Sequence, residues 1–193
     1  AGGLGSLPCA MLTPDKAREQ VNIVRQQVSV PVNMNFFAHT PAAPEPARVA
    51  AWRERLAPYY EELGLDPKMP VPMASRAPFD AAMCEVVEEL KPEVVSFHFG
   101  LPEPALLTRV KAAGSVVIAS ATTVAEARWL AARGAEAIIA QGAEAGGHRS
   151  MFLTDDIATQ SGTFALVPQM VDAVDVPVIA AGGIADGRGI AAA

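Results

Sequence analysis

The chain has 193 residues, of which 51% are hydrophobic and 6% are aromatic, so it carries enough aliphatic material for one large buried core. Its 15 basic residues are outnumbered by 21 acidic ones, giving a formal net charge of −6, and the basic residues form no cluster. This balance excludes the electrostatic signature of a protein that binds nucleic acid or an anionic membrane, and it favours a small-molecule partner.

Short apolar runs alternate with longer helical patterns along the chain. Strands are predicted at 30–37, 94–99, 115–120, 135–140 and 176–181, with 4–7 as the tail of another strand. Helices are predicted near 14–27, 44–63, 79–90, 103–113, 124–132 and 162–174. This alternation is typical of successive βα units, and therefore of an α/β fold with a parallel sheet buried on both faces.

We expect a (β/α)8 TIM barrel that is incomplete. Such a barrel usually needs about 250 residues, and six strands in a chain of 193 residues would leave two sheet edges unpaired. The prediction is that the first and last strands are missing and that 176–181 is the seventh strand. The alternative is an open doubly wound sheet.

The stretch from 39 to 76 interrupts this alternation. It is rich in proline and holds Trp52 and the Tyr59–Tyr60 pair, so we interpret it as an elaborated connection, with a lid as one possible role. We treat residues 1–193 as one domain. Because the chain starts without Met and its last residues carry no helix stop signal, we expect a fragment of a longer protein.

The two cysteines, Cys9 and Cys84, lie far apart and show no CxxC or Cys/His ligand spacing. The sequence therefore predicts no metal site and no disulfide framework, and it suits a reduced, cytoplasmic setting. No apolar run approaches the roughly 18 residues of a membrane span. Nothing in the sequence predicts an oligomeric state.

A glycine-rich loop from 141 to 150 directly follows a predicted strand. Ligands of parallel α/β folds sit beyond the carboxyl ends of the strands, where Gly146 and Gly147 would let the backbone approach a cofactor closely. His148 lies inside this loop, and a histidine can give or take a proton at neutral pH. We therefore predict His148 as the reactive side chain. The alternative for any Gly-Gly pair is a mobile turn.

A second glycine turn, Gly182–Gly183, follows the strand 176–181 and precedes a helix start. Its amides could point at a phosphate with the help of the helix dipole. Asn35 lies near the end of an otherwise apolar strand, and its amide, together with that of Gln141, would suit the pyrimidine edge of a flavin. His98 is as readily structural as functional, and the structural interpretation is favoured for His39.

The two glycine segments, taken with Ser96 to Pro102 and with 151–156 and 177–193, resemble nitronate monooxygenase of the bacterial class once called 2-nitropropane dioxygenase. The resemblance covers essentially the whole chain. It implies an FMN-dependent barrel that oxidises alkyl nitronates, such as propionate 3-nitronate, with molecular oxygen. Where the family usually has Gly after His-Arg, this chain has Ser150, which is tolerable unless the position needs a positive φ.

Carried over by position, the resemblance implies that Asn35, Gln141, Gly146 and Gly183 contact FMN and that Gly182 lies in the phosphate loop. His148 would be the active-site histidine. We expect the nitronate, already an anion, to stack on the flavin and give up one electron, after which oxygen completes the oxidation. His148 would hold the nitro oxygens, or act as a base if a neutral nitroalkane were offered.

Two kinds of alternative stay open. Relatives that share the glycine-histidine loop include FMN-dependent enoyl-ACP reductases and NADH:quinone reductases, which would reduce the flavin with NADH. The chain could also be a non-catalytic barrel that binds a phosphorylated ligand, or an inactive fragment. The first strand and the eighth strand with its phosphate contacts are expected from the family and are missing, so FMN retention by this piece is in question.

Overall fold

The computed structural model describes residues 2–43, 45–70 and 76–193. The chain divides into two compact units, and each is described by itself. The larger unit combines Ala1–His39 with Arg76–Ala193, and the smaller unit is Thr40–Ser75. All of the residues predicted to form the functional site lie in the larger unit.

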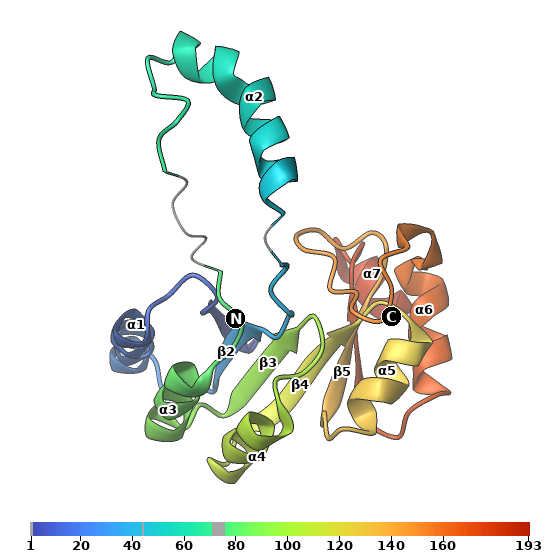
Figure 1. The fold of residues 1–193 in the computed structure, drawn as a ribbon. Coiled ribbons are helices and arrows are strands. Elements are labelled where there is room, and N and C mark those ends of the chain that lie inside the picture. The colour runs from blue at the N-terminus through green and yellow to red at the C-terminus, as the bar shows by residue number, and fades with distance from the viewer. Residues whose placement is uncertain (1, 44, 71–75) are drawn as a thin grey trace. The chain divides into compact units, whose positions relative to one another are not determined.

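The larger unit is built on a parallel sheet of six strands that curls, with helices along its outer face (Figure 1). The strands are β1 (Gly5–Pro8), β2 (Val32–Phe37), β3 (Val94–His98), β4 (Val116–Ala121), β5 (Ala137–Gln141) and β6 (Val178–Ala181). Each strand pairs with the next one in the chain, so the order never reverses. A doubly wound sheet reverses its strand order at a switch point, so the sheet is half of a (β/α) barrel, as predicted.

Helices alternate with these strands. They are α1 (Pro14–Gln27), α3 (Ala81–Leu90), α4 (Pro104–Ala112), α5 (Val124–Ala131), α6 (Thr163–Val171) and α7 (Gly187–Ala192), with a short 3-10 turn at Ile157–Thr159. Side chains of Thr13, Asp80 and Thr123 accept hydrogen bonds from backbone N–H groups in the first turns of α1, α3 and α5. These caps explain why the helices begin where they do.

Strand alternation divides the sheet into two chemically different faces. The outer face is apolar and fully buried against the helices, with Met34, Val95 and Phe97 at its centre. The inner face carries polar side chains. Register places Asn35 opposite Ser96 and Phe37 opposite His98 on neighbouring strands. The inner face therefore gathers polar and aromatic groups toward the carboxyl ends of the strands, where the loops begin.

The predicted strands and helices of this unit are all present, with ends that differ from the prediction by at most three residues. The strand predicted from 30 begins at Val32, after Pro31, because proline cannot donate to the ladder. The strand predicted to reach Phe99 ends at His98, where Phe99 adopts a φ of 66°. The predicted tail at 4–7 is the four-residue strand β1, and the strand predicted at 176–181 is β6, the last of the six described strands. Its place as the seventh strand of a full barrel stays a prediction.

The smaller unit contains one helix, α2 (Pro46–Glu62). The predicted start at Pro44 and the end of the connection at 71–75 lie outside the described residues. Trp52 and Tyr59 are exposed on this helix, and Arg53 donates a hydrogen bond to the carbonyl of Met69. The lid role of this connection stays a prediction. Among the helices that the structure describes, none combines the length and apolarity needed to cross a membrane.

Candidate functional site

The carboxyl edge of the sheet holds a cavity of about 360 Å³. Parallel strands end at the same edge, so loops far apart in the sequence meet there. Five of the seven predicted site residues line this cavity: Asn35, Gln141, Gly146, Gly147 and His148. The cavity is also lined by Pro8, Ala10, Met11, Phe37, Arg76 and His98. The other two predicted residues, Gly182 and Gly183, line a different cavity of about 640 Å³.

His148 is exposed in the loop after β5, and aromatic rings fix its position. Its imidazole packs edge-on against Phe37, at 5.1 Å between ring centroids, and against Phe99, at 6.0 Å. The two phenylalanines come from the ends of β2 and β3. The reactive histidine predicted from the sequence is therefore held by side chains from two other strands.

Gln141 is the last residue of β5, and its amide is used to hold the histidine loop. Its Nε2 donates to the carbonyl of His148 at 2.9 Å, and its Oε1 accepts from the backbone N–H and the hydroxyl of Ser150 at 2.8 and 3.0 Å. Ser150 is fully buried and is absent from the residues with positive φ. The departure from the family's Gly is thus accommodated, and the serine hydroxyl adds a contact to the loop.

Arg149 clamps the same loop from the other side. Its guanidinium donates to the carbonyl oxygens of Gly142, Ala143 and Ala145 at 2.7, 3.1 and 2.9 Å. These carbonyls belong to the start of the loop, so the arginine closes the loop onto its own stem. The charge of Arg149 is therefore committed to the protein rather than to a ligand.

Asn35 lies in a polar layer on the inner face. Its Nδ2 and that of Asn33 both donate to the hydroxyl oxygen of Ser96 at 2.8 Å, and Asn33 also donates to Ser6. Within the described part of the chain, the Oδ1 of the buried Asn33 has no hydrogen-bond partner. The Asn35 side chain therefore keeps its carbonyl oxygen as an acceptor and one N–H as a donor for a ligand, which is what its predicted role requires.

His98, which the sequence left undecided, lies in the cavity. Its Nδ1 is 2.7 Å from the hydroxyl oxygen of Ser120, a fully buried residue of β4. Burial, and secondarily the charge of His148, lowers the pKa of His98 from its ordinary value of 6.5. His98 is consequently neutral at pH 7. Sequence reasoning did not identify Ser120, because only the register of β3 and β4 brings it beside the imidazole.

The Gly182–Gly183 turn packs closely on the histidine loop. Gly182 and Gly183 have φ values of 117° and 72°, and a Cβ on Gly182 would lie 2.7 Å from the backbone nitrogen of Ala145. The two glycine segments therefore share one rim of the sheet. Among the described residues, no acceptor is found for the backbone N–H groups of this turn.

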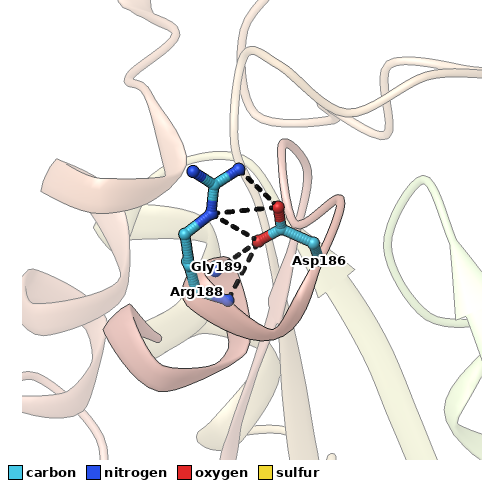
Figure 2. A network of polar contacts seen from close by, with 3 residues as sticks. All are labelled: Asp186, Arg188 and Gly189. Atoms are coloured by element: carbon cyan, nitrogen blue, oxygen red, sulfur yellow. Dashed lines mark hydrogen bonds and ion pairs between the residues drawn. The ribbon is translucent and has the colours of Figure 1, made fainter.

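The helix that follows this turn, α7, is capped by the carboxylate of Asp186. The carboxylate of Asp186 accepts from the backbone N–H groups of Arg188 and Gly189 at 2.9 and 3.4 Å and pairs with the Arg188 guanidinium at 2.6 Å (Figure 2). The hydrogen bond from Arg188 lowers the pKa of Asp186. The start of α7 is thus capped by a charged side chain, and a phosphate would depend on the Gly182 and Gly183 amides instead.

The larger cavity is chemically unlike the smaller one. It is lined mainly by apolar side chains such as Phe164 and Val167, together with the carboxylates of Glu144 and Asp172. Glu144 accepts from the backbone N–H and hydroxyl of Thr163 at 2.7 and 2.9 Å, and these hydrogen bonds lower its pKa. No basic side chain lines this cavity. Its charge opposes an anionic ligand.

Glu126, a fully buried residue of α5, anchors the chain beyond the histidine loop. One carboxylate oxygen accepts from the backbone N–H and hydroxyl of Thr122, each at 2.7 Å, and the other from the N–H groups of Phe152 and Leu153 at 2.7 and 3.2 Å. The sequence signal was the Thr123-x-x-Glu126 capping box, which sequence reasoning did not use. In the described part of the chain, no three His, Cys, Asp or Glu side chains gather into a possible metal site.

Comparison with known proteins places this chain in a family. The family model described as nitronate monooxygenase matches residues 1–193. The chain is 44% identical over 194 residues to a nitronate monooxygenase of Paraburkholderia phytofirmans and 40% identical to one of Pseudomonas aeruginosa. Both alignments cover 100% of this chain, but only 53% and 55% of the relatives, so the chain spans about half their length.

Solved structures agree with this grouping. The chain is similar to nitroalkane oxidase from Streptomyces ansochromogenes, with a TM-score of 0.84 and 34% identity over 99% of this chain and 55% of that one. FabK from Thermotoga maritima follows, with a TM-score of 0.67 and 29% identity over 99% of this chain and 46% of that one. The chain belongs to the nitronate monooxygenase family.

Proposed function

We propose that the protein oxidises alkyl nitronates, such as propionate 3-nitronate, with FMN and molecular oxygen. The observation that carries this proposal is the cavity at the carboxyl edge, which brings His148 together with Asn35, Gln141 and two glycines in a chain of this family. The cavity holds two histidines and an arginine but no carboxylate. This lining suits a substrate that is already an anion.

The residues present fit a flavin. Gly146 and Gly147 line the cavity, and a Cβ built on either would meet no atom within 4 Å, so bare backbone borders open space there. No acceptor for their backbone N–H groups is found among the described residues. These backbone amides, with the Asn35 side-chain amide and the one N–H of Gln141 that the histidine loop does not use, would hold the ring, because a flavin edge carries both donors and acceptors.

Gly182 and Gly183 would contribute backbone N–H groups to the phosphate. Their turn lies against the histidine loop, so amides from both segments belong to one rim. The negative charge of Glu144 would repel a phosphate at this turn. Its side chain would be 3.4 Å from a Cβ built on Gly183, and its pKa is lowered, which favours the charged form. We therefore expect the phosphate to be held by neutral amide donors on the side of the turn away from this carboxylate.

In this proposal FMN supplies the electron acceptor that the oxidation requires. The protein's own residues bind and orient the substrate. His148 donates a hydrogen bond to the nitro oxygens, and Phe37 and Phe99 keep its ring in place. Gln141 and Arg149 hold the loop that carries it. With a neutral nitroalkane, His148 would instead accept the proton from carbon.

The test is the variant His148→Asn, compared with His39→Asn. His39 packs on Phe37 and Phe99 but does not line the cavity, so it controls for disturbance of the aromatic cluster. We expect His148→Asn to lower kcat/KM for nitronate about 100-fold and to abolish activity with nitroalkane. Oxygen uptake measures both. Unchanged uptake with both substrates in His148→Asn would show that the assigned role is wrong.

An absorption spectrum distinguishes the alternative functions. The purified protein should bind FMN and turn yellow, whereas a non-catalytic phosphate-binding barrel or an inactive fragment would stay colourless after reconstitution. NADH should leave the flavin oxidised in the absence of oxygen. Rapid bleaching by NADH would instead favour an enoyl-ACP or quinone reductase.

A further inference from the structure

Among the described residues, Arg76 is the one lysine or arginine whose side chain lines the histidine cavity. It is the last residue of the connection predicted at 39–76, and sequence reasoning gave it no role of its own. Its side chain is exposed, and among the described residues it takes part in no hydrogen bond or ion pair. Arg149 and Arg188, which also lie near the rim, are committed to backbone carbonyls and to Asp186 respectively.

Among the described residues that line this cavity, Arg76 carries the permanent positive charge. Desolvation and the charge of His148 keep His98 neutral at pH 7, and the amides of Asn35 and Gln141 carry no net charge. In the described part of the chain, no Asp or Glu lines the cavity to neutralise a guanidinium. A free guanidinium in a partly enclosed space therefore gives this cavity a positive potential that does not depend on a histidine.

We propose that Arg76 determines specificity for the anionic substrate by binding the two oxygens of the nitronate. The planar guanidinium presents paired N–H donors at the spacing of two oxygens on one atom, which a nitronate shares with a carboxylate. A neutral nitroalkane offers the same oxygens without the negative charge, so it gains less from this contact. This inference rests on the proposed oxidation of nitronates.

The cofactor phosphate is a weaker explanation for Arg76. The turn proposed to hold the phosphate, Gly182–Gly183, lines the other cavity, and Arg76 does not line that one. His148, proposed to hold the nitro oxygens, lines the same cavity as Arg76. The cation and the histidine are therefore placed to share one small anion.

Kinetics of Arg76→Gln and Arg76→Lys test the assignment, with Arg128→Gln as the control. Arg128 is also exposed, has no partner among the described residues and does not line the cavity. Loss of a charge-assisted hydrogen bond should raise KM for nitronate about tenfold or more in Arg76→Gln. We expect kcat to stay within about twofold. KM for the neutral nitroalkane and the FMN content should not change.

Arg76→Lys should recover part of the affinity, because lysine keeps the charge but loses the paired donors. Equal KM changes for the anionic and neutral substrates would overturn the proposal, as would no change in either. Loss of FMN from Arg76→Gln, with normal kinetics after saturation with FMN, would overturn it in favour of a cofactor contact.

Nitrate binding provides a readout that does not depend on turnover. Nitrate is a planar oxyanion of nitrogen, and calorimetry can measure its affinity for the purified protein and for Arg76→Gln. We expect Arg76→Gln to weaken nitrate binding about tenfold. If nitrate binds in an Arg76-dependent way but nitronate is not oxidised, the proposed function fails while the anion site stands. Equal nitrate affinity in both proteins would overturn the anion site itself.

Discussion

The two cavities at the rim of the sheet differ in charge more than in size. The larger one, about 640 Å³, is mainly apolar, and its charged groups are the carboxylates of Glu144 and Asp172. The smaller one, about 360 Å³, holds Arg76, His98 and His148 with no carboxylate. The larger cavity offers more volume, but the smaller one suits the anionic substrate proposed above. Charge and hydrogen-bond donors therefore favour the smaller cavity as the candidate site.

The walls of the two cavities are also built differently. The histidine loop is tied down by Gln141 and Arg149, whose side chains together make six hydrogen bonds to it. The Gly182–Gly183 turn has no such ties within the described residues, and it depends on close packing against Ala145. The smaller cavity is thus pre-organised by side chains, which is what a site that orients a reacting group requires.

Glu126→Ala should break this pre-organisation most severely. The substitution leaves the N–H and hydroxyl of Thr122 and the N–H groups of Phe152 and Leu153 without their acceptor, in a buried place. We expect the free energy of unfolding to fall by about 4 kcal/mol. Urea denaturation measures it. Arg128→Ala, an exposed change on the same helix, should alter it by less than about 0.5 kcal/mol.

Gly142→Ala should separate the two cavities by forcing apart the end of β5 and the start of α6. A Cβ at this position would lie 2.0 Å from the Thr163 hydroxyl oxygen and 2.5 Å from its backbone nitrogen. Because backbone must move, we expect a loss of about 3 kcal/mol in unfolding free energy. Gly146→Ala is the matched control, since its Cβ meets nothing within 4 Å and its φ is not positive. Equal losses in both variants would contradict the packing argument.

The fold could be predicted from the sequence because its signals are local. Apolar runs and the glycine turns each occupy a short stretch, and their alternation with helical patterns was enough to predict an α/β fold with a parallel sheet. Strand ends were less certain, since Phe99 leaves β3 through a positive φ that its residue type does not favour. The choice of barrel over doubly wound sheet needed the strand order itself.

Only part of the candidate site could be predicted, because the rest depends on register. The glycine loop marked His148 directly, whereas the partner of His98 is Ser120, which lies 22 residues away on a neighbouring strand. Arg76 reaches the cavity from outside the alternating pattern, so no spacing rule could place it. Gln141 was predicted to contact a flavin, and its observed hydrogen bonds show that it also holds the loop.

Gln141→Leu should loosen the smaller cavity without affecting the larger one. Leucine cannot accept from the buried N–H and hydroxyl of Ser150 or donate to the His148 carbonyl, so the loop loses three hydrogen bonds. We expect a loss of about 2 kcal/mol in unfolding free energy. FMN should also bind more weakly, which fluorescence titration measures. Ser161→Ala, in a residue that lines neither cavity, should leave FMN affinity unchanged.

The titration of His98 gives the smallest effect and sharpens the charge difference between the cavities. Burial and the charge of His148 place the folded-state pKa of His98 below the unfolded value of 6.5. Below pH 6.5 His98 therefore binds a proton more readily in the unfolded chain than in the folded protein. Stability from this group is complete above pH 6.5 and is lost as the pH falls from there through the lower folded pKa.

Urea denaturation at pH 7.5 and at intervals down to pH 5 measures this dependence. His98→Asn should flatten it over the upper part of that range, because asparagine does not titrate and the remaining groups are common to both proteins. Ser120→Ala keeps the imidazole and should keep the dependence, since burial rather than the serine hydrogen bond is the main cause of the lowered pKa. An unchanged pH dependence in His98→Asn would contradict the assignment of this dependence to His98.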